Sequence, residues 1–262
     1  MMRSQHRVEN VYVPVQVPVT LTGGEKEQTV TLPGGTTWGA SLSSYVEIES
    51  ISKPMTNAAN GIYVFHLSRY KNVLDNFRVE LNGKDPGLTT ALLFDTQYTT
   101  KFTLHVPPDW TRDDLHEIIW QIHRVPDTAE QGLDAQPVIS LRIIDNVFAV
   151  HYMYSTAPIS YAGNNMEVRN SPNFGTITGN STYNFEINYK ISRGNASPDG
   201  NLTVKINDVV QYTYTGPIGS EDVVGPYIKF GIYKSVWKAE HDNPVDTISR
   251  RYGFSSMIVT TP

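Results

Sequence analysis

The stretch Val138–Tyr152, VISLRIIDNVFAVHY, carries the pattern that decides the fold. Two short runs rich in β-branched and aromatic residues, typical of strands, flank the dipeptide Asp145-Asn146. Because Asp and Asn tolerate the left-handed backbone that a tight two-residue turn requires, the stretch predicts a β-hairpin. Ile206-Asn207-Asp208-Val209 predicts a second hairpin for the same reason.

Segments of this kind recur along the chain and end at Gly, Pro, Asn or Asp. The other predicted strands are Val11–Val19, Thr29–Leu32, Tyr45–Ile51, Phe77–Leu81, Phe102–Val106, Ile118–His123, Tyr183–Ile191, Leu202–Ile206, Val209–Tyr214, Tyr227–Tyr233 and Gly253–Val259. Only Thr111–Ile119 predicts a short helix, with Thr111 as its N-cap. The pattern favours an all-β fold with a single domain over residues 1–262, a sandwich of two stacked antiparallel sheets.

Composition excludes several classes of function. The 262 residues include no cysteine, so a disulfide framework, a thiol nucleophile and a cysteine metal site are ruled out. The net charge of −5 comes without a basic block, which argues against a nucleic-acid partner bound through its phosphates. No apolar run approaches the roughly 18 residues of a membrane helix, so we expect no membrane partner.

Three of the predicted strands carry unusual polar residues at every second position, and therefore on one face. The polar sets are Arg78 and Glu80, then Gln121 and His123, then Tyr227, Lys229 and Tyr233. The alternate positions are apolar and predict the core side: Phe77, Val79 and Leu81, then Ile118, Trp120 and Ile122, then Ile228, Phe230 and Ile232. Strand faces that only meet solvent usually carry Lys, Glu, Thr and Ser. Arg, Gln, His and Tyr together on these strands therefore predict a concave face lined with polar side chains, which we call the polar floor.

These segments resemble the signature of jelly-roll polysaccharide lyases: Arg-x-Glu-Leu, Gln-Ile-His and Tyr-x-Lys-x-Gly-x-Tyr, in that order. Alginate lyases of polysaccharide lyase family 7 carry all three motifs. The segments GPYIKFGIYKSVW and SRRYGFSSMIV resemble heparin-lyase-like and glucuronan-lyase-like proteins more than they resemble the alginate lyases. Asn82 replaces a further Arg of the alginate lyases, and Lys234 and Ser235 replace their Asn-Gln pair. The resemblance implies a concanavalin-like jelly roll and β-elimination of a uronate-containing anionic polysaccharide.

The resemblance also implies roles for individual residues. Gln121 and Arg78 would neutralise the uronate carboxylate, His123 would be the base, and Tyr233 the acid or both acid and base. These residue types suit the chemistry, since donors stabilise developing negative charge and a neutral imidazole accepts a proton near neutral pH. The implied substrate-binding residues are Glu80, which orients Arg78, together with Lys229, Tyr227, Arg124 and Arg142.

Two alternatives use the same kind of fold. A non-catalytic carbohydrate-binding module, lectin-like or for virion attachment, would need the same polar floor without elimination geometry. A retaining glycosidase would need two carboxylates, for which Glu47 and Glu49 have a suitable spacing but no third acidic position behind them.

We expect no catalytic metal and no cofactor, because the seven histidines are scattered along the sequence. The sequence leaves open whether the acidic loops bind a structural calcium ion. The expected partner is an anionic polysaccharide. The expected localisation is extracellular or virion-associated, although residues 1–20 show no signal peptide. The oligomeric state stays open.

Overall fold

The computed structural model describes residues 15–16, 28–31, 37–42, 49–51, 62–68, 78–82, 91–127, 136–161, 164–235 and 249–261. The first strands are β1 (Val15–Gln16), β2 (Gln28–Thr31), β3 (Thr37–Leu42), β4 (Glu49–Ile51), β5 (Ile62–Ser68), β6 (Arg78–Asn82), β7 (Gln97–His105), β8 (Glu117–His123) and β9 (Pro137–Ile144). The others are β10 (Val147–Ser155), β11 (Met166–Asn170), β12 (Phe174–Thr176), β13 (Thr182–Lys190), β14 (Asn201–Ile206), β15 (Val209–Thr215), β16 (Tyr227–Tyr233) and β17 (Ser249–Thr260). Within these ranges the one helical element is the 3₁₀ turn η3 (Gly194–Ala196).

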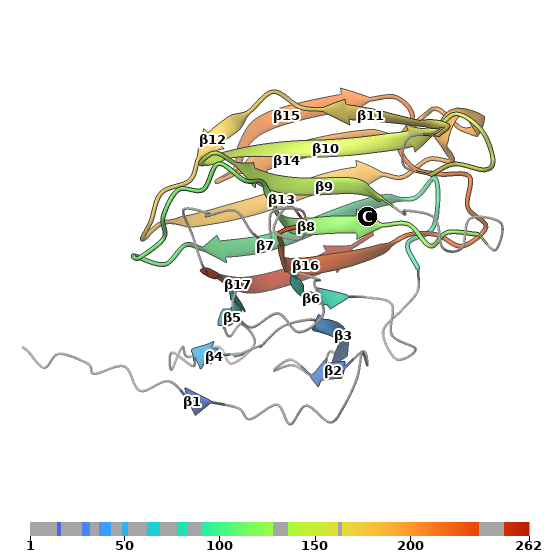
Figure 1. The fold of residues 1–262 in the computed structure, drawn as a ribbon. Helices are drawn as coiled ribbons and strands as arrows, with labels where there is room; N and C mark the ends of the chain where they lie inside the picture. Colours follow the sequence, from blue (N-terminus) through green and yellow to red (C-terminus); the bar gives the residue numbers. More distant parts are fainter. Residues whose placement is uncertain are drawn as a thin grey trace, which may run out of the picture.

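The strands form two antiparallel sheets, which Figure 1 shows as stacked layers. One sheet has the order β1-β4-β5-β17-β7-β13-β14-β15, and the other has the order β11-β10-β9-β8-β16-β6-β3-β2, with β12 paired to β10. The chain crosses between the layers several times: β8 to β12 lie in one sheet, β13 to β15 in the other, and β16 and β17 in one sheet each. The predicted all-β sandwich of two antiparallel sheets is confirmed; the single domain over residues 1–262 stays a prediction.

Aromatic side chains fill the space between the two sheets. Phe102 on β7 stacks on Phe185 of β13, with ring centroids 5.0 Å apart, and meets Phe230 of β16 edge-on at 5.5 Å. Trp120 on β8 contacts Tyr189 of β13, at a centroid distance of 5.9 Å. Offset and edge-on ring pairs of this kind stabilise a core beyond the apolar area they bury. These contacts turn one face of β8 and β16 inward and leave the other face for the polar residues.

Both predicted hairpins are confirmed. Ile144 pairs with Val147 across the β9–β10 turn, where Asp145 and Asn146 have φ angles of 49° and 63°. The β14–β15 turn repeats this conformation at Asn207 and Asp208. Two consecutive positive φ angles match the right-handed twist of the flanking strands, and Asp and Asn adopt them at low cost.

The predicted helix over Thr111–Ile119 is wrong. Residues 106–116 contain no helix, only a turn at 108–109 and a bend at 114–115, and β8 begins at Glu117. The Asp113 carboxylate accepts the backbone N–H of Leu115 at 2.8 Å, which closes a local turn in competition with the helix. Its second oxygen accepts Lys234 Nζ at 2.8 Å, a partner far away in sequence.

The sequence pattern also missed β3, β5, β11 and β12. Val11–Val19, Tyr45–Ile51 and Phe77 lie partly or wholly outside the described residues.

Phe102→Ala is expected to lower the free energy of unfolding by about 3–5 kcal/mol, the usual cost of truncating a buried phenylalanine. The reason is that Phe102 packs against aromatic rings of three other strands from both sheets. Urea denaturation at pH 7 measures the change. A loss below about 1 kcal/mol would contradict a central position for this ring.

Candidate active site

The three polar strands lie next to one another, in the order β8-β16-β6. On β16, Tyr227 pairs with His123 of β8, and Lys229 pairs with Gln121. Towards β6, Gly231 pairs with Glu80 and Tyr233 pairs with Arg78. Directly paired residues in antiparallel strands point to the same face, so the pairing brings together the residues singled out on these strands.

Glu80 lies at the centre of this polar face and is buried. Its carboxylate accepts a hydrogen bond from the Gln121 amide nitrogen. It also lies 3.9 Å from Lys229 Nζ and 4.0 Å from the Arg78 guanidinium. Two cations thus surround one carboxylate, which leaves the cluster with one net positive charge. Gln121 and Lys229 are buried beside it, whereas Arg78 is partly exposed.

The His123 ring is held in a defined protonation state. Its Nδ1 lies 2.9 Å from the backbone carbonyl of Arg124. Because a carbonyl only accepts, Nδ1 carries the proton, and Nε2 of the neutral ring keeps a lone pair. Burial, followed by the positive charge of Lys229, lowers the pKa of His123 to about 3. The partly exposed ring also lies 5.6 Å from the ring of Tyr227.

Tyr233 ends β16 on the same face, with the Arg78 guanidinium 4.4 Å from its ring centroid. Two residues earlier, Gly231 adopts a φ of 141°. A Cβ atom there would lie 2.1 Å from the carbonyl oxygen of Val79 on β6. Only glycine permits this approach, so Gly231 keeps β16 against β6 where Tyr233 and Arg78 meet.

A β-bulge in β8 changes one predicted position. The register shifts between Ile118 and Trp120, so Ile118 pairs with Tyr233 of β16 and Arg142 of β9. Ile118 therefore lies on the polar face, where its side chain is still buried, and its predicted place on the same face as Trp120 and Ile122 is wrong. The inserted residue Ile119 joins the core instead.

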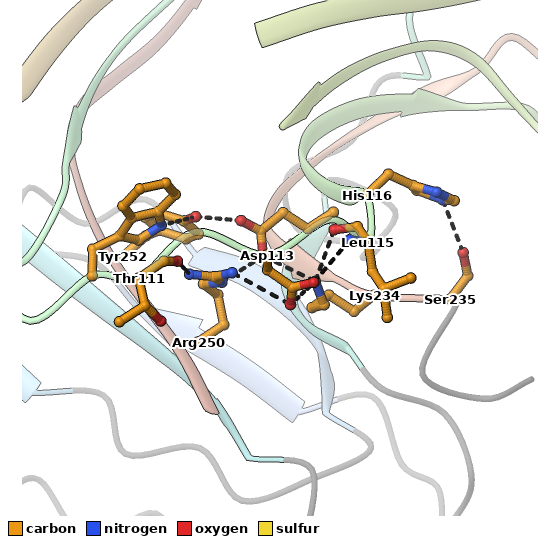
Figure 2. Close-up of polar contacts among 10 residues, drawn as sticks. Thr111, Asp113, Leu115, His116, Lys234, Ser235, Arg250 and Tyr252 are labelled. Atoms are coloured by element: carbon orange, nitrogen blue, oxygen red, sulfur yellow. Dashed lines mark hydrogen bonds and ion pairs between the residues drawn. The ribbon is translucent and has the colours of Figure 1, made fainter. Parts of the chain in front are cut away.

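Behind this end of β8 and β16 lies a buried ionic network, shown in Figure 2. Lys234 Nζ lies 2.8 Å from Asp113 and 3.7 Å from Glu117, and it donates to the carbonyl of Leu115 at 3.0 Å. Arg250 on β17 pairs with Glu117 at 2.8 Å and with Asp113 at 3.5 Å. The departure from the Asn-Gln pair of the alginate lyases thus has a structural reason. Lys234 follows Tyr233, points to the other side of β16 and balances two buried carboxylates.

Two further residues complete the network. The Tyr252 hydroxyl donates to Glu117, and the Trp110 indole N–H donates to the Tyr252 oxygen at 2.8 Å. None of these residues was singled out from the sequence as part of one group. Asp113 and Glu117 are near each other in the sequence, but Lys234 lies 121 positions after Asp113, and only the fold brings these carboxylates to Lys234 and Arg250.

Arg124 does not lie where a substrate-binding residue would. Its guanidinium is buried and forms a two-point ion pair with Asp222, with Nε 2.8 Å from Oδ2. It also donates to the carbonyl oxygen of Ser160. The expected role in binding carboxylates or sulfates is therefore replaced by a structural one. The ion pair anchors the residue whose carbonyl orients His123.

Arg142 lies on the polar face, next to two histidines that the sequence reading left out. The pKa of His116 and of His151 is lowered to about 4 in each case, first by burial and then by the charge of Arg142. The signal that could have found His151 is the strand register: His151 pairs with Ser140, which pairs with Gln121. His116 precedes β8, so no pairing marks it.

In the part of the chain that the structure describes, no group of three or more His, Asp or Glu residues is arranged to hold a metal ion. The expectation of no metal and no cofactor stays a prediction. Among the same residues, no helix is long and apolar enough to cross a membrane.

The sequence model of the family described as Polysaccharide lyase matches residues 47–252. The match covers more than half of the chain, so the chain belongs to this family and is a polysaccharide lyase. The resemblance found in the three motifs is confirmed. A search of curated protein sequences finds no match.

Solved structures share the fold. An endo-β-1,4-glucuronan lyase from the fungus Trichoderma reesei is 14% identical, with a TM-score of 0.67, over 83% of this chain and 90% of that chain. A family 7 alginate lyase, A1-II′, in complex with a product is 17% identical, with a TM-score of 0.53, over 89% of this chain and 93% of that chain. At these identities the likeness shows a common architecture.

Lys234→Met is expected to destabilise the protein by about 3–5 kcal/mol, the usual cost of breaking a buried ion pair. The substitution leaves Asp113 and Glu117 buried with Arg250 as the remaining cation of the network. Urea denaturation at pH 7 gives the magnitude. Lys190→Met is the matched control, because Lys190 pairs with the exposed Asp199 and its loss should change stability little. Equal effects of the two substitutions would contradict the importance of the network.

His123 is expected to stay neutral from pH 7 down to pH 5, because its folded pKa is about 3 whereas the unfolded chain titrates near 6.5. Between these pH values the unfolded state binds more protons, so the contribution of His123 to stability falls as the pH is lowered. Nitrogen chemical shifts of ¹⁵N-labelled histidine, assigned with His123→Gln, measure both the charge and the tautomer. A midpoint near 6.5, or a proton on Nε2, would contradict this geometry.

Proposed function

We propose that this polysaccharide lyase cleaves a uronate-containing polymer by β-elimination on the polar face of β6, β8 and β16. The observation that carries the proposal is that one face of three adjacent strands holds His123 with Nε2 unprotonated, a positively charged cluster around Glu80, and Tyr233 with its ring beside Arg78. Elimination needs these three capacities together: a base, a stabiliser of the developing enolate and an acid.

Arg78 and Gln121 would neutralise the carboxylate of the substrate. The Gln121 amide nitrogen has two protons, and Glu80 accepts one of them, so the second can donate to the substrate. The Gln121 amide oxygen is buried, and no described residue gives it a hydrogen bond. A sugar hydroxyl could donate to it. A buried polar atom without a partner calls for an explanation, and a bound sugar would supply one.

The proton transfers follow from the chemistry of the sugar. His123 Nε2 takes the proton from C5, and the electron pair of that bond forms the C4–C5 double bond. The C4–O bond breaks with its electron pair on oxygen, and the Tyr233 hydroxyl donates a proton to that oxygen. For sugars whose C5 proton lies on the opposite face, Tyr233 would serve as both base and acid.

The substrate class is supported by charge and by the fold. The Glu80 cluster keeps a net positive charge although the whole chain carries −5. A local positive potential of this kind attracts a polyanion. The structures with the same fold include a glucuronan lyase and an alginate lyase, enzymes named for polymers of uronates. Tyr227 and Lys229 would line the sugar-binding site, since Lys229 Nζ lies 5.4 Å from the Tyr227 ring centroid.

Tyr233→Phe tests the mechanism, because it removes one hydroxyl and keeps the ring beside Arg78. Turnover should fall by about 10²–10⁴-fold, the usual effect of losing general acid–base help, while the affinity for the polymer changes little. The assay follows the absorbance of the unsaturated product on alginate, glucuronan and a sulfated uronate polymer, with a neutral β-glucan as control.

Two results would contradict the proposal. Wild-type turnover by Tyr233→Phe would remove this residue from the reaction. A wild-type protein that binds all three anionic polymers but releases no unsaturated product would instead favour a binding module.

A further inference from the structure

The polar face continues past β8 onto β9 and β10. Ser140 on β9 pairs with Gln121 on one side and with His151 of β10 on the other. Arg142 pairs with Ile118 and with Ala149. Direct pairing puts these side chains on the same face of the sheet as the candidate catalytic residues.

Arg142 differs from the other cations of this region in its partners. Its Nε donates to Ser140 Oγ at 3.0 Å, and its side chain is half-buried. No carboxylate of the described residues lies within ion-pair distance of it, whereas Arg78, Arg124 and Arg250 each have one. A half-buried charge without an opposite charge costs free energy. The cost is visible in the pKa of Arg142, which burial lowers to about 10.

Two histidines lie near enough to Arg142 for its positive charge to lower the pKa of both. His116 precedes β8, and its Nε2 lies 3.4 Å from Ser235 Oγ. Figure 2 shows the two side chains pointing toward each other. His151 stands on β10, beyond Ser140. A neutral imidazole offers one N–H donor to an anion without adding a second cation next to Arg142. The group therefore provides one charge and several donors, a suitable combination for a single carboxylate.

We propose that Arg142, His116 and His151 form an anion subsite that binds the carboxylate of a sugar neighbouring the one that reacts. The inference rests on the proposed function, because the ligand is another part of the same polymer. β9 lies two strands from β16, so Arg142 and Tyr233 are about 10 Å apart along the sheet. A disaccharide unit spans this distance. The subsite binds the polymer without contacting the reacting atoms, so it affects the binding of substrate more than turnover.

The test uses Arg142→Gln in an otherwise wild-type enzyme. The KM for the polymer should rise about 10–100-fold, the range expected for one hydrogen-bonded charge pair, with little change in kcat. Dissociation constants of Tyr233→Phe and of the Arg142→Gln/Tyr233→Phe double variant, measured by calorimetry, give the same ratio without turnover. The loss should disappear for the shortest oligouronates that are still cleaved, because they cannot reach both sites.

Arg169→Gln is the matched control. Arg169 lies on β11 of the same sheet, where it is exposed and pairs with Glu167. Its strand partner Tyr152 belongs to the core, so Arg169 projects from the opposite face. This variant should keep the wild-type KM.

If Arg142→Gln fails to fold, Arg142→Lys takes its place. Lysine keeps the charge but loses the planar fork that binds a carboxylate through two hydrogen bonds, so the polymer KM should still rise several-fold. An unchanged KM in the folded variant, or an equal loss for short and long substrates, overturns the subsite while the lyase assignment stands. Absence of any unsaturated product from the wild-type enzyme overturns the proposed function instead.

Discussion

The pairing of β16 with its two neighbours is the constraint on which the rest of the site depends. Gln121 pairs with Lys229, and alternation along β16 puts Lys229 and Tyr233 on the same face. Which other residues meet there depends on the register between β16 and each neighbouring strand. It is regular towards β6, where Gly231 allows a contact that no other residue could make. It is irregular towards β8, where the bulge between Ile118 and Trp120 shifts the pairing. Because of this bulge, one strand presents Gln121 and His123 outward and Glu117 inward.

Charge is distributed differently on the two sides of this sheet. Inside, Lys234 and Arg250 balance Asp113 and Glu117, so the buried network is neutral and can persist in a low dielectric. Outside, two cations share Glu80. Arg142 adds a third cation for which no described residue provides a carboxylate. A protein with a negative net charge thus concentrates positive charge on the one face where a polyanion would bind.

The sequence was sufficient for those features that depend on local chemistry. Asp145-Asn146 required a hairpin, and the alternation of polar and apolar residues gave the face of Gln121 and His123 correctly. Features that depend on distant partners could not be read in this way. The turn at Asp113 competes with a helix partly because Lys234 takes its second oxygen. Arg124 looked like a ligand residue because Asp222, its partner, lies 98 positions away along the chain. A bulge leaves no clear mark in a period-2 pattern, so Ile118 was assigned to the wrong face.

The low pKa of His123 is consistent with a role as base once the substrate is considered. In the free protein, burial and the charge of Lys229 keep the ring neutral, and an acceptor of pKa about 3 is a weak base. A uronate bound beside Arg78 and Lys229 would bring a negative charge close to the same ring. That charge opposes the effect of the cations and raises the affinity of Nε2 for a proton. In the proposed mechanism, a bound substrate would therefore increase the basicity of His123. In the same mechanism, the cations that lower the pKa of His123 in the free protein would stabilise the enolate.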